Sequence, residues 1–384
     1  MASSTHDHHH HHHFPPPSTT TTAPPPTPST TTTTSSTSTT TTDLLSRLLH
    51  RLPPSLSTTT GPTPLLLRRR SSLSTITTPP IIPFTDLKTS LSSTLPTISQ
   101  LGYFQLTDHN IPSQLANSAE SDSLTLFNLS THQKHQHFPP TWPLGFNDDD
   151  DDDVSAAQSL FLDSACSTGS SSELAITSLR EFTREMEKVG LAVVEALTCA
   201  VGVRCPGLDD PGTVSTLMWV SENDYGEKVV GSGRFYPYVV GLHYQIRSRS
   251  CSLLTDSGLV SVLPEVDSIL ITIGDIAQVW SNGKLKKVRG KPALNMEEGG
   301  SDTSSLSMSL LVTLPLESTV SPLDPRAAIG NGDTDHHDNE NKDVHEECSE
   351  ERLFGSFSFE DYAWRVYHDR VPLKDPLDRY RNKL

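Results

Sequence analysis

The residues best suited to chemistry gather in two segments, FYPYVVGLHYQ (235–245) and ITIGDIAQVWSNGKLKKVRGKP (271–292). The first contains His243, and histidine is both the commonest metal ligand and the usual acid–base group near neutral pH. A metal site needs several converging ligands, whereas Gln245, two residues further on, offers only a neutral amide. We therefore interpret His243 as a histidine whose ring is satisfied by hydrogen bonds at the end of a strand.

Other histidines have spacings that could suit a metal, in the groups His132/His135/His137 and His336/His337/His345. Both groups lie in polar segments without the apolar pattern of a rigid element. We interpret both as solvated loop residues, so no metal is assigned to them.

The elements around these residues divide the chain into a helical half and a β-rich half. Residues 79–87 and 101–112 are expected to be extended, a polar helix follows, and 172–203 has apolar residues at helical spacing. From Ser215 onward the pattern changes to short β runs separated by Gly, Pro or polar turns, at 215–221, 239–245, 250–255, 258–264, 268–275 and 306–315. An amphipathic helix is expected at 357–371. Short strands after a helical half indicate an α+β protein with a sandwich or barrel core.

Composition limits what lies outside this core. Residues 1–42 are mostly Ser, Thr, Pro and His and are expected to be disordered. Residues 43–78 are expected to be a linker with a short amphipathic helix. This acid-poor, Ser/Thr-rich N-terminus also suits a plastid transit peptide, which is the alternative to a cytoplasmic protein. Of the net charge of −17, Asp148–Asp153 and residues 324–351 together hold −14. The acidity therefore belongs to solvated loops, and 324–352 is expected to be a disordered acidic loop.

Cysteine and hydrophobic content exclude several classes of protein. The five cysteines form no CxxC pair, and their odd number favours a reducing compartment over a disulfide framework. No apolar run approaches the roughly 20 residues of a membrane helix. No basic stripe is interleaved with aromatic residues, so nucleic-acid binding is not expected. We expect a monomer without nucleic-acid or membrane partners.

Three motifs give the chain a resemblance to a known family. GYFQLTDHNIP (102–112), FYPYVVGLHYQ (235–245) and ITIGDIAQVWSNGKLKKV (271–288) resemble the Gly-Phe-Phe-Gln…Asn-His-Gly-Ile-Pro, Tyr-Tyr-Pro…Gly-His-Thr-Asp and Asn-Ile-Gly-Asp…Trp-Ser-Asn-Gly motifs of plant 2-oxoglutarate- and iron(II)-dependent dioxygenases, the isopenicillin N synthase-like group. The similarity covers about residues 79–375. It implies a double-stranded β-helix, or jelly roll, at 206–323, behind an N-terminal helical and strand part at 79–205 and before a C-terminal helical segment at 353–384.

The resemblance also shows what this chain lacks. The family holds iron with two His and one carboxylate, which leave open positions for 2-oxoglutarate and dioxygen. His243 keeps the first ligand position, but Gln245 replaces the carboxylate and Gly290 replaces the distal His. Restoring Asp at 245 and His at 290 is therefore expected to create metal affinity. An error in the gene model could also mimic this loss.

The co-substrate site implied by the resemblance is reduced as well. The family grips the distal carboxylate of 2-oxoglutarate with an Arg-x-Ser pair and a tyrosine, since a guanidinium forms charge-assisted bonds to a carboxylate. Tyr236 and Ser307 remain, whereas Ser305 replaces the Arg. The two remnants also have a simple structural interpretation, which is packing and hydrogen bonding inside the barrel.

Across the barrel mouth, the resemblance places basic residues from two facing segments. These are Arg247, Arg249, Lys284, Lys286, Lys287, Arg289 and Lys291. They could be a solvated rim, because strand edges commonly carry Lys and Arg. Alternatively they could attract a small anionic ligand, an acidic protein segment or the chain's own acidic loop.

These observations favour a non-catalytic dioxygenase-like protein that serves as a binding or scaffold module, with no assigned cofactor. The alternative is an active oxidoreductase of this family that binds iron(II) and 2-oxoglutarate at an unconventional metal site and acts on a small plant metabolite. The substrate itself is not encoded in these motifs.

Overall fold

The computed structural model describes residues 76–147, 158–169, 174–206, 213–222, 235–295, 306–326, 352–368 and 375–383. All of them belong to one compact unit, residues 70–384. The expected tail at 1–42, nearly all of the linker at 43–78 and most of the acidic loop at 324–352 lie outside the described residues. Among the described residues, no helix is both long and apolar enough to cross a membrane.

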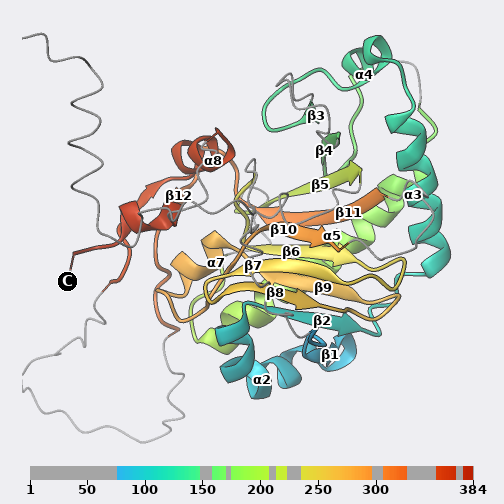
Figure 1. Ribbon diagram of the computed structural model, residues 1–384. Helices are drawn as coiled ribbons and strands as arrows, with labels where there is room; N and C mark the ends of the chain where they lie inside the picture. Colours follow the sequence, from blue (N-terminus) through green and yellow to red (C-terminus); the bar gives the residue numbers. More distant parts are fainter. Residues whose placement is uncertain are drawn as a thin grey trace, which may run out of the picture. The chain divides into compact units, whose positions relative to one another are not determined.

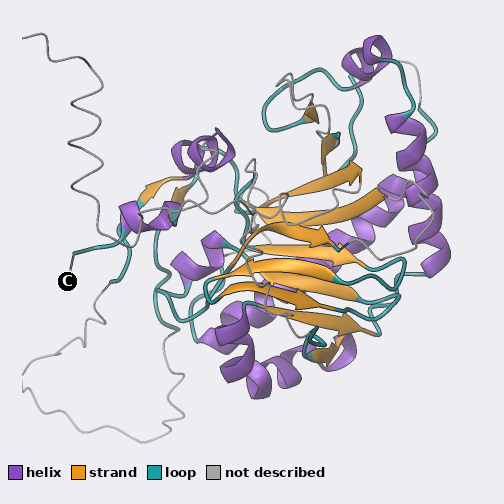
Figure 2. Ribbon diagram, in the orientation of Figure 1, coloured by secondary structure: helices purple, strands orange, loops and turns teal. Residues whose placement is uncertain are grey.

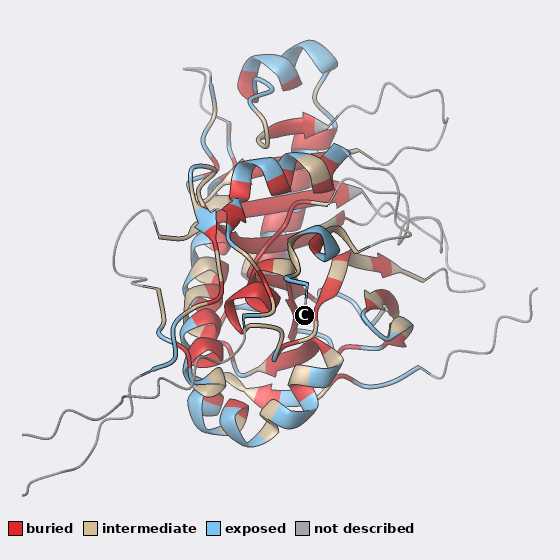
Figure 3. Cartoon of the chain, turned by 90° about the vertical axis from the view of Figure 1, so that its left-hand side faces the viewer, coloured by how far each residue is buried: buried red, intermediate tan, exposed pale blue. Residues whose placement is uncertain are grey.

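The largest sheet has eight strands in the order β1-β2-β9-β6-β11-β5-β4-β3 (Figure 1). Its strands are β1 (Ile81–Pro83), β2 (Tyr103–Thr107), β3 (Gly145–Asn147), β4 (Ser159–Asp163), β5 (Ser215–Glu222), β6 (Val240–Tyr244), β9 (Ile269–Ile273) and β11 (Leu306–Thr313). Apart from the parallel pair β1 and β2, neighbouring strands are antiparallel. Strands β6, β9 and β11 are buried along nearly their whole length, which explains their continuous apolar runs (Figure 3).

A second sheet has three strands in the order β10-β7-β8, namely β10 (Val288–Leu294), β7 (Cys251–Thr255) and β8 (Gly258–Val262). Apolar side chains of both sheets form a common core, to which Tyr103 and Leu270 contribute from the large sheet and Leu253, Val262 and Val288 from the small one. Two facing antiparallel sheets with side chains packed between them are the walls of a β-sandwich. The expected jelly-roll core with α-helical cover is confirmed.

Helices cover the opposite face of the large sheet (Figure 2). They are α2 (Leu87–Leu101), α3 (Ser113–Phe127) and α5 (Thr177–Val201), with the short α4 (Thr131–His137) beyond α3. Helix α5 packs closely against the sheet at Gly190, where an added Cβ would lie 2.8 Å from Val312 Cγ2 and 3.3 Å from Leu242 Cδ1. Because side chains alternate along a strand, Leu242 and Val312 facing α5 direct His243 and Ser309 toward the other sheet.

The C-terminal residues form a small lobe of helix α8 (Phe359–His368), the 3₁₀ helix η3 (Pro376–Tyr380) and the strand pair β12 (Thr319–Val320) and β13 (Phe357–Ser358). Short helix α7 (Asp275–Trp280) connects β9 to the segment before β10. Buried Phe354, Phe359 and Tyr362 join this lobe to the main core.

The sequence patterns located most strands but misassigned one region. Residues 79–87, expected to be extended, contain only the three-residue β1 before the 3₁₀ helix η2 (Phe84–Asp86) and the start of α2. Helix α2 was not anticipated, because LKTSLSSTLPTISQL is rich in Ser and Thr, which have modest helix propensity, and contains Pro96. Tertiary burial of Leu87, Leu91 and Ile98 supplies the stabilisation that propensity lacks.

Candidate functional site

Three strands of the large sheet present a row of polar side chains to the barrel interior. The backbone register pairs Ser309 of β11 with His243 of β6 on one side and with Trp219 of β5 on the other. Two residues further along, Ser307 pairs with Ser221. Because side chains two apart share a face, these five residues line the same surface of the sheet.

Both ring nitrogens of His243 are held by neighbouring side chains. Nδ1 lies 2.7 Å from Ser309 Oγ, and Nε2 lies 3.0 Å from Thr272 Oγ1. The residue before Leu242 makes room for this arrangement, because a Cβ on Gly241 would stand 2.7 Å from Thr272 Oγ1 and 3.0 Å from His243 Nε2. The hydrogen bond between His243 and Thr272 therefore depends on a glycine at position 241, opposite Thr272 in the sheet.

The contacts continue as a chain of hydrogen bonds across the barrel. Thr272 Oγ1 donates to the Tyr238 hydroxyl over 3.2 Å, and that hydroxyl donates to the carbonyl of Gly290 over 2.8 Å. The hydroxyl hydrogen of Thr272 is used in its bond to Tyr238, so Thr272 accepts a hydrogen bond from His243 Nε2–H. Nδ1 then carries no hydrogen and accepts one from the Ser309 hydroxyl. The His243 lone pair is thus occupied by a protein hydroxyl.

The environment of His243 keeps its ring neutral. Burial lowers the pKa of His243 to about 3, and the positive charge of Lys291 acts in the same direction. A neutral imidazole can in principle bind a metal, but here it would first have to break its hydrogen bond with Ser309.

The other two ligand positions supply neither a carboxylate nor a second histidine. The Gln245 side-chain amide donates to the backbone carbonyl of His243 over 3.1 Å. Gly290 has a φ of +74°, and a Cβ there would lie 2.3 Å from Phe235 Cε1. The expectation that Asp at 245 and His at 290 would by themselves restore metal affinity therefore needs correction, because a side chain at 290 would be strained by the positive φ and would require the Phe235 ring to move.

The co-substrate remnants also have protein partners. Ser307 Oγ lies 2.8 Å from Ser221 Oγ. Tyr236 is 2% exposed and packs among Trp142, Phe161 and Phe359, and burial raises the pKa of its hydroxyl. Ser305 lies outside the described residues. The packing interpretation of Tyr236 and Ser307 is consistent with these contacts.

Lys291 reaches this row of side chains from the opposite sheet. Its ammonium donates to Ser221 Oγ over 3.0 Å and lies 4.9 Å from the centre of the Trp219 ring. The pairing of β10 with β7 shifts register between Arg289 and Ala293, around the positive φ of Gly290. Such a bulge re-aims side chains, and here it accompanies a lysine directed at β5.

An open pocket of about 60 Å³ lies beside the row. Its walls include His243, Gln245, Arg247, Arg249, Ser307 and Ser309, together with the apolar side chains Ile246, Pro292, Leu294, Leu306 and Met308. This volume would hold several water molecules, since one needs roughly 10–15 Å³ on this scale. The structure thus brings together part of the expected set: the first ligand position, its neighbour, two of the arginines and Ser307.

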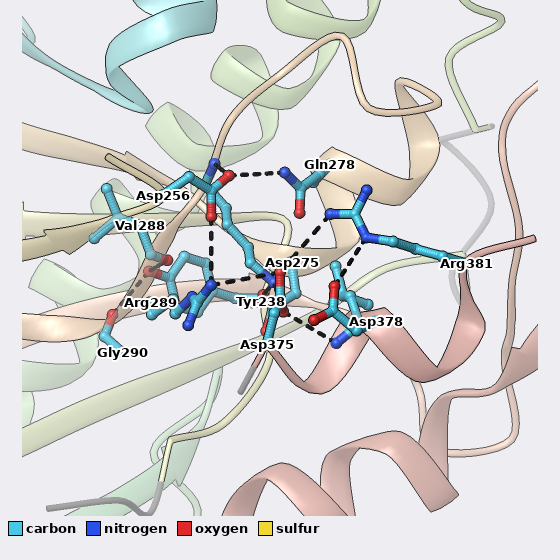
Figure 4. A network of polar contacts seen from close by, with 12 residues as sticks. Tyr238, Asp256, Asp275, Gln278, Val288, Arg289, Gly290, Asp375, Asp378 and Arg381 are labelled. Carbon is cyan, nitrogen blue, oxygen red and sulfur yellow. Dashed lines mark hydrogen bonds and ion pairs between the residues drawn. The ribbon is translucent and has the colours of Figure 1, made fainter. Parts of the chain in front are cut away.

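The remaining basic residues do not form one exposed rim. Lys287 is fully buried, and its ammonium lies 2.6 Å from Asp375 Oδ1 and 2.7 Å from Asp275 Oδ1. Arg289 contacts the same Asp375 at 3.5 Å and Asp256 at 3.8 Å (Figure 4). These two cations fasten the C-terminal segment to β10, so the interpretation of Lys287 as a surface charge is wrong.

Arg247 makes a two-pronged ion pair with the nearly buried Glu120 of α3, at 2.6 and 2.7 Å. Lys284 is exposed and Lys286 is half-buried at the turn before β10. Arg249 lines the pocket. The seven basic residues therefore lie in different environments and do not act as one charged surface.

Several important residues were not identified from the sequence. Ser309 could have been found by alternation from Ser307, whereas Thr272, Tyr238 and Trp219 carry no local signal because only the sheet register places them near His243. In the part of the chain that the structure describes, no group of three or more His, Cys, Asp or Glu could hold a metal ion. Gln245, whose amide donates to the backbone, and Gly290, which has no side chain, do not supply the carboxylate and second His that the implied iron would need.

Known proteins resemble the chain in both sequence and fold. No protein-family model matches it. Gibberellin 2-beta-dioxygenase 1 of Arabidopsis thaliana is 23% identical over 301 residues, which cover 70% of this chain and 83% of the relative. The gibberellin 2-beta-dioxygenase of Phaseolus coccineus is 25% identical over 221 residues, covering 49% and 64%.

Solved structures show the same architecture. JOX2, crystallised with 2OG, Fe and JA, superposes with a TM-score of 0.60 at 15% identity, covering 82% of this chain and 92% of its own. The rice dioxygenase for auxin oxidation gives a TM-score of 0.57 at 16% identity, covering 79% and 99%. In sequence the chain is thus similar to plant gibberellin 2-beta-dioxygenases, and in fold it is similar to 2OG- and Fe-dependent oxygenases.

Proposed function

We propose that this chain is a non-catalytic member of the plant 2-oxoglutarate- and iron(II)-dependent dioxygenase superfamily that uses its barrel as a ligand-binding module. The carrying observation is the state of His243, whose two ring nitrogens are both engaged by side chains of the same barrel. Gln245 is turned to the backbone, and position 290 cannot accept a side chain without rearrangement. A facial triad needs three groups free to converge on one ion, so these contacts oppose metal binding at three separate points.

The hydrogen-bond chain from Ser309 to Gly290 supports a structural role for the former ligand positions. In place of a metal, four consecutive hydrogen bonds connect β11, β6, β9 and β10. Satisfied buried networks fix one arrangement of a core, because breaking any member leaves a buried polar group unpaired. The barrel can therefore keep its shape without iron.

Turnover is the direct test. The purified protein is incubated with iron(II), 2-oxoglutarate and ascorbate, and succinate is measured against a His243→Ala control. We expect no succinate above that control, and no iron(II) binding in a parallel calorimetric titration. Succinate formation by the wild type that His243→Ala abolishes would overturn the proposal and favour the alternative, an active oxygenase.

A further inference from the structure

Two cysteines lie at the turn where helix α5 ends. Cys199 is in the last turn of α5, and the chain reverses at Gly202, whose N–H donates to the Cys199 carbonyl over 3.1 Å. The N–H of Val203 likewise donates to the carbonyl of Thr198 over 3.1 Å. This reversal returns Cys205 to the end of the helix, where its thiol is hydrogen-bonded with the Thr198 side chain. Both cysteines are free thiols.

A guanidinium lies against the more exposed of the two sulfurs. Cys199 is exposed, and Arg326 Nη1 donates to its Sγ over 3.0 Å. Arg326 is itself held at the turn, because its backbone N–H donates to the Gly202 carbonyl over 2.9 Å. Glu195, one helical turn before Cys199, is engaged by Lys88 of α2 in an ion pair of 2.8 Å. Reactive cysteines are found in such electropositive, solvent-accessible surroundings.

The buried cysteines have the opposite surroundings. Cys166 and Cys251 are 0% and 1% exposed, and burial raises the pKa of their thiols to about 11 and about 12. Buried thiols of this kind are inert. Cys205 is intermediate, since burial raises its pKa while the hydrogen bond with Thr198 opposes the rise. An exposed thiol that reacts first, beside a second thiol that can resolve the product, is the arrangement of a redox-sensing pair.

We propose that Cys199 and Cys205 form a reversible redox site that reacts with a peroxide. The Cys199 sulfur attacks one peroxide oxygen, the O–O bond breaks, and the leaving oxygen takes the thiol proton and departs as water, so that Cys199 becomes a sulfenic acid. The Cys205 sulfur then attacks the Cys199 sulfur. An S–S bond forms, the S–O bond breaks, and a second water leaves with the Cys205 proton. Two thiols are thus oxidised by two electrons, while hydrogen peroxide is reduced to two waters.

The position of the pair suits a transient bond and not a structural staple. A disulfide between Cys199 and Cys205 would close a short loop, and it would therefore remove less chain entropy than a bond between distant parts of the sequence. The cysteine count favours a reducing compartment, where disulfides are usually transient and redox-sensing. The site lies at the end of α5 and does not use the residues around His243.

Peptide mapping after peroxide treatment tests the proposal. The full-length protein is reduced, separated from the reductant and exposed to hydrogen peroxide, and its remaining thiols are blocked with N-ethylmaleimide under denaturing conditions. Trypsin cleaves after Arg204, between the two cysteines, so the disulfide appears as peptide 189–204 joined to peptide 205–228. We expect this joined pair in the wild type and its loss on treatment with dithiothreitol. Cys166 and Cys251 should carry the maleimide.

Variants separate the two steps of the reaction. Cys205→Ser should stop at the sulfenic acid, which dimedone traps on Cys199, and Cys199→Ser should leave the Cys205 thiol unreacted. Arg326→Gln should slow the loss of the Cys199 thiol by about 2- to 5-fold, the effect of one exposed charge. Arg184→Gln is the matched control, because it removes an exposed arginine from an earlier part of α5, and it should react at the wild-type rate.

Far-ultraviolet circular dichroism verifies that each variant is folded. The proposal is overturned if peroxide leaves both thiols intact, if Cys199 is oxidised without forming the joined peptides, or if Cys199 instead couples to Cys348 or to a second chain. Loss of the Cys166 and Cys251 thiols at the same rate would show non-specific oxidation and would also overturn it. Equal rates for wild type and Arg326→Gln would overturn the role of the guanidinium. The succinate assay measures none of these events, so failure here leaves the non-catalytic proposal standing.

Discussion

The buried ammonium of Lys287 offers the sharpest test of the structure. It contacts Asp275 and Asp375 at 2.7 and 2.6 Å, and its side chain is fully buried. We consider Lys287→Met, which keeps a similar apolar length while removing the charge. The two carboxylates, with side chains only 15% and 9% exposed, would then lose their nearest cation.

The expected loss of stability is large. Removing one partner of a buried ion pair typically costs about 3–5 kcal/mol, because the opposite charge stays buried without compensation. Arg289 and Arg381 remain 3.5 and 3.9 Å from Asp375, which favours the lower part of that range. For a domain of this size about 3 kcal/mol corresponds to a fall in Tm of roughly 6–12 °C.

The loss should also depend on pH. Burial tends to raise the pKa of Asp375, but Lys287, the Leu377 N–H and Arg289 outweigh it, so that the pKa lies below its ordinary value. A carboxyl with a depressed folded-state pKa stabilises the protein above its unfolded pKa, and this contribution is lost as pH falls through the folded value. In Lys287→Met, protonation of Asp375 removes the cost of burying its uncompensated charge. The difference in free energy of unfolding between this variant and wild type should therefore shrink as pH is lowered toward 4.

Urea unfolding at pH 7 and pH 4.5, monitored by tryptophan fluorescence, measures both effects. Lys284→Met is the control, since an exposed lysine should change the free energy of unfolding by less than about 0.5 kcal/mol. The reasoning is refuted if Lys287→Met lies within 1 kcal/mol of wild type at pH 7 (about one third of the loss expected above). A deficit that is as large at pH 4.5 as at pH 7 would refute the electrostatic origin.

Three further outcomes are expected. The double variant Gln245→Asp/Gly290→His should bind no iron(II) in a calorimetric titration. Adding Phe235→Ala should allow binding, because it removes the ring that lies 2.3 Å from the new Cβ, and binding by the double variant itself would contradict this geometry. The pKa of His243 is about 3 in the folded protein and 6.5 in the unfolded chain, so its contribution to stability is complete above pH 6.5 and is lost as pH falls. Between pH 8 and pH 5, the free energy of unfolding of wild type, measured with urea, should therefore fall by about 2 kcal/mol more than that of His243→Gln. Equal losses in the two proteins would argue against a buried neutral ring. Arg247→Ala should lower the free energy of unfolding by about 1–3 kcal/mol by stranding its nearly buried carboxylate partner, and an unchanged midpoint would show that the pair is not formed in solution.

The order and type of the main elements were predictable because they depend on local periodicity. Short apolar runs after Ser215 became strands, and the apolar stripe of 172–203 became α5. The motifs likewise place Gln245 and Gly290 where the resemblance implies a carboxylate and a histidine. Helix α2 escaped prediction because its sequence has weak helix propensity, and its stability comes from burial against other elements.

The environments of the polar and charged residues were decided by the tertiary structure alone. Lys287 and Lys284 look alike in the sequence SNGKLKKV, yet one is buried between two aspartates, of which Asp375 is 88 residues away, and the other is exposed. The two ring nitrogens of His243 are hydrogen-bonded by Ser309 and Thr272, which lie 66 and 29 residues away in the sequence and are brought to it by the strand register. Residue type and spacing fix what a side chain can do, but its partners come from long-range packing, which no local pattern encodes.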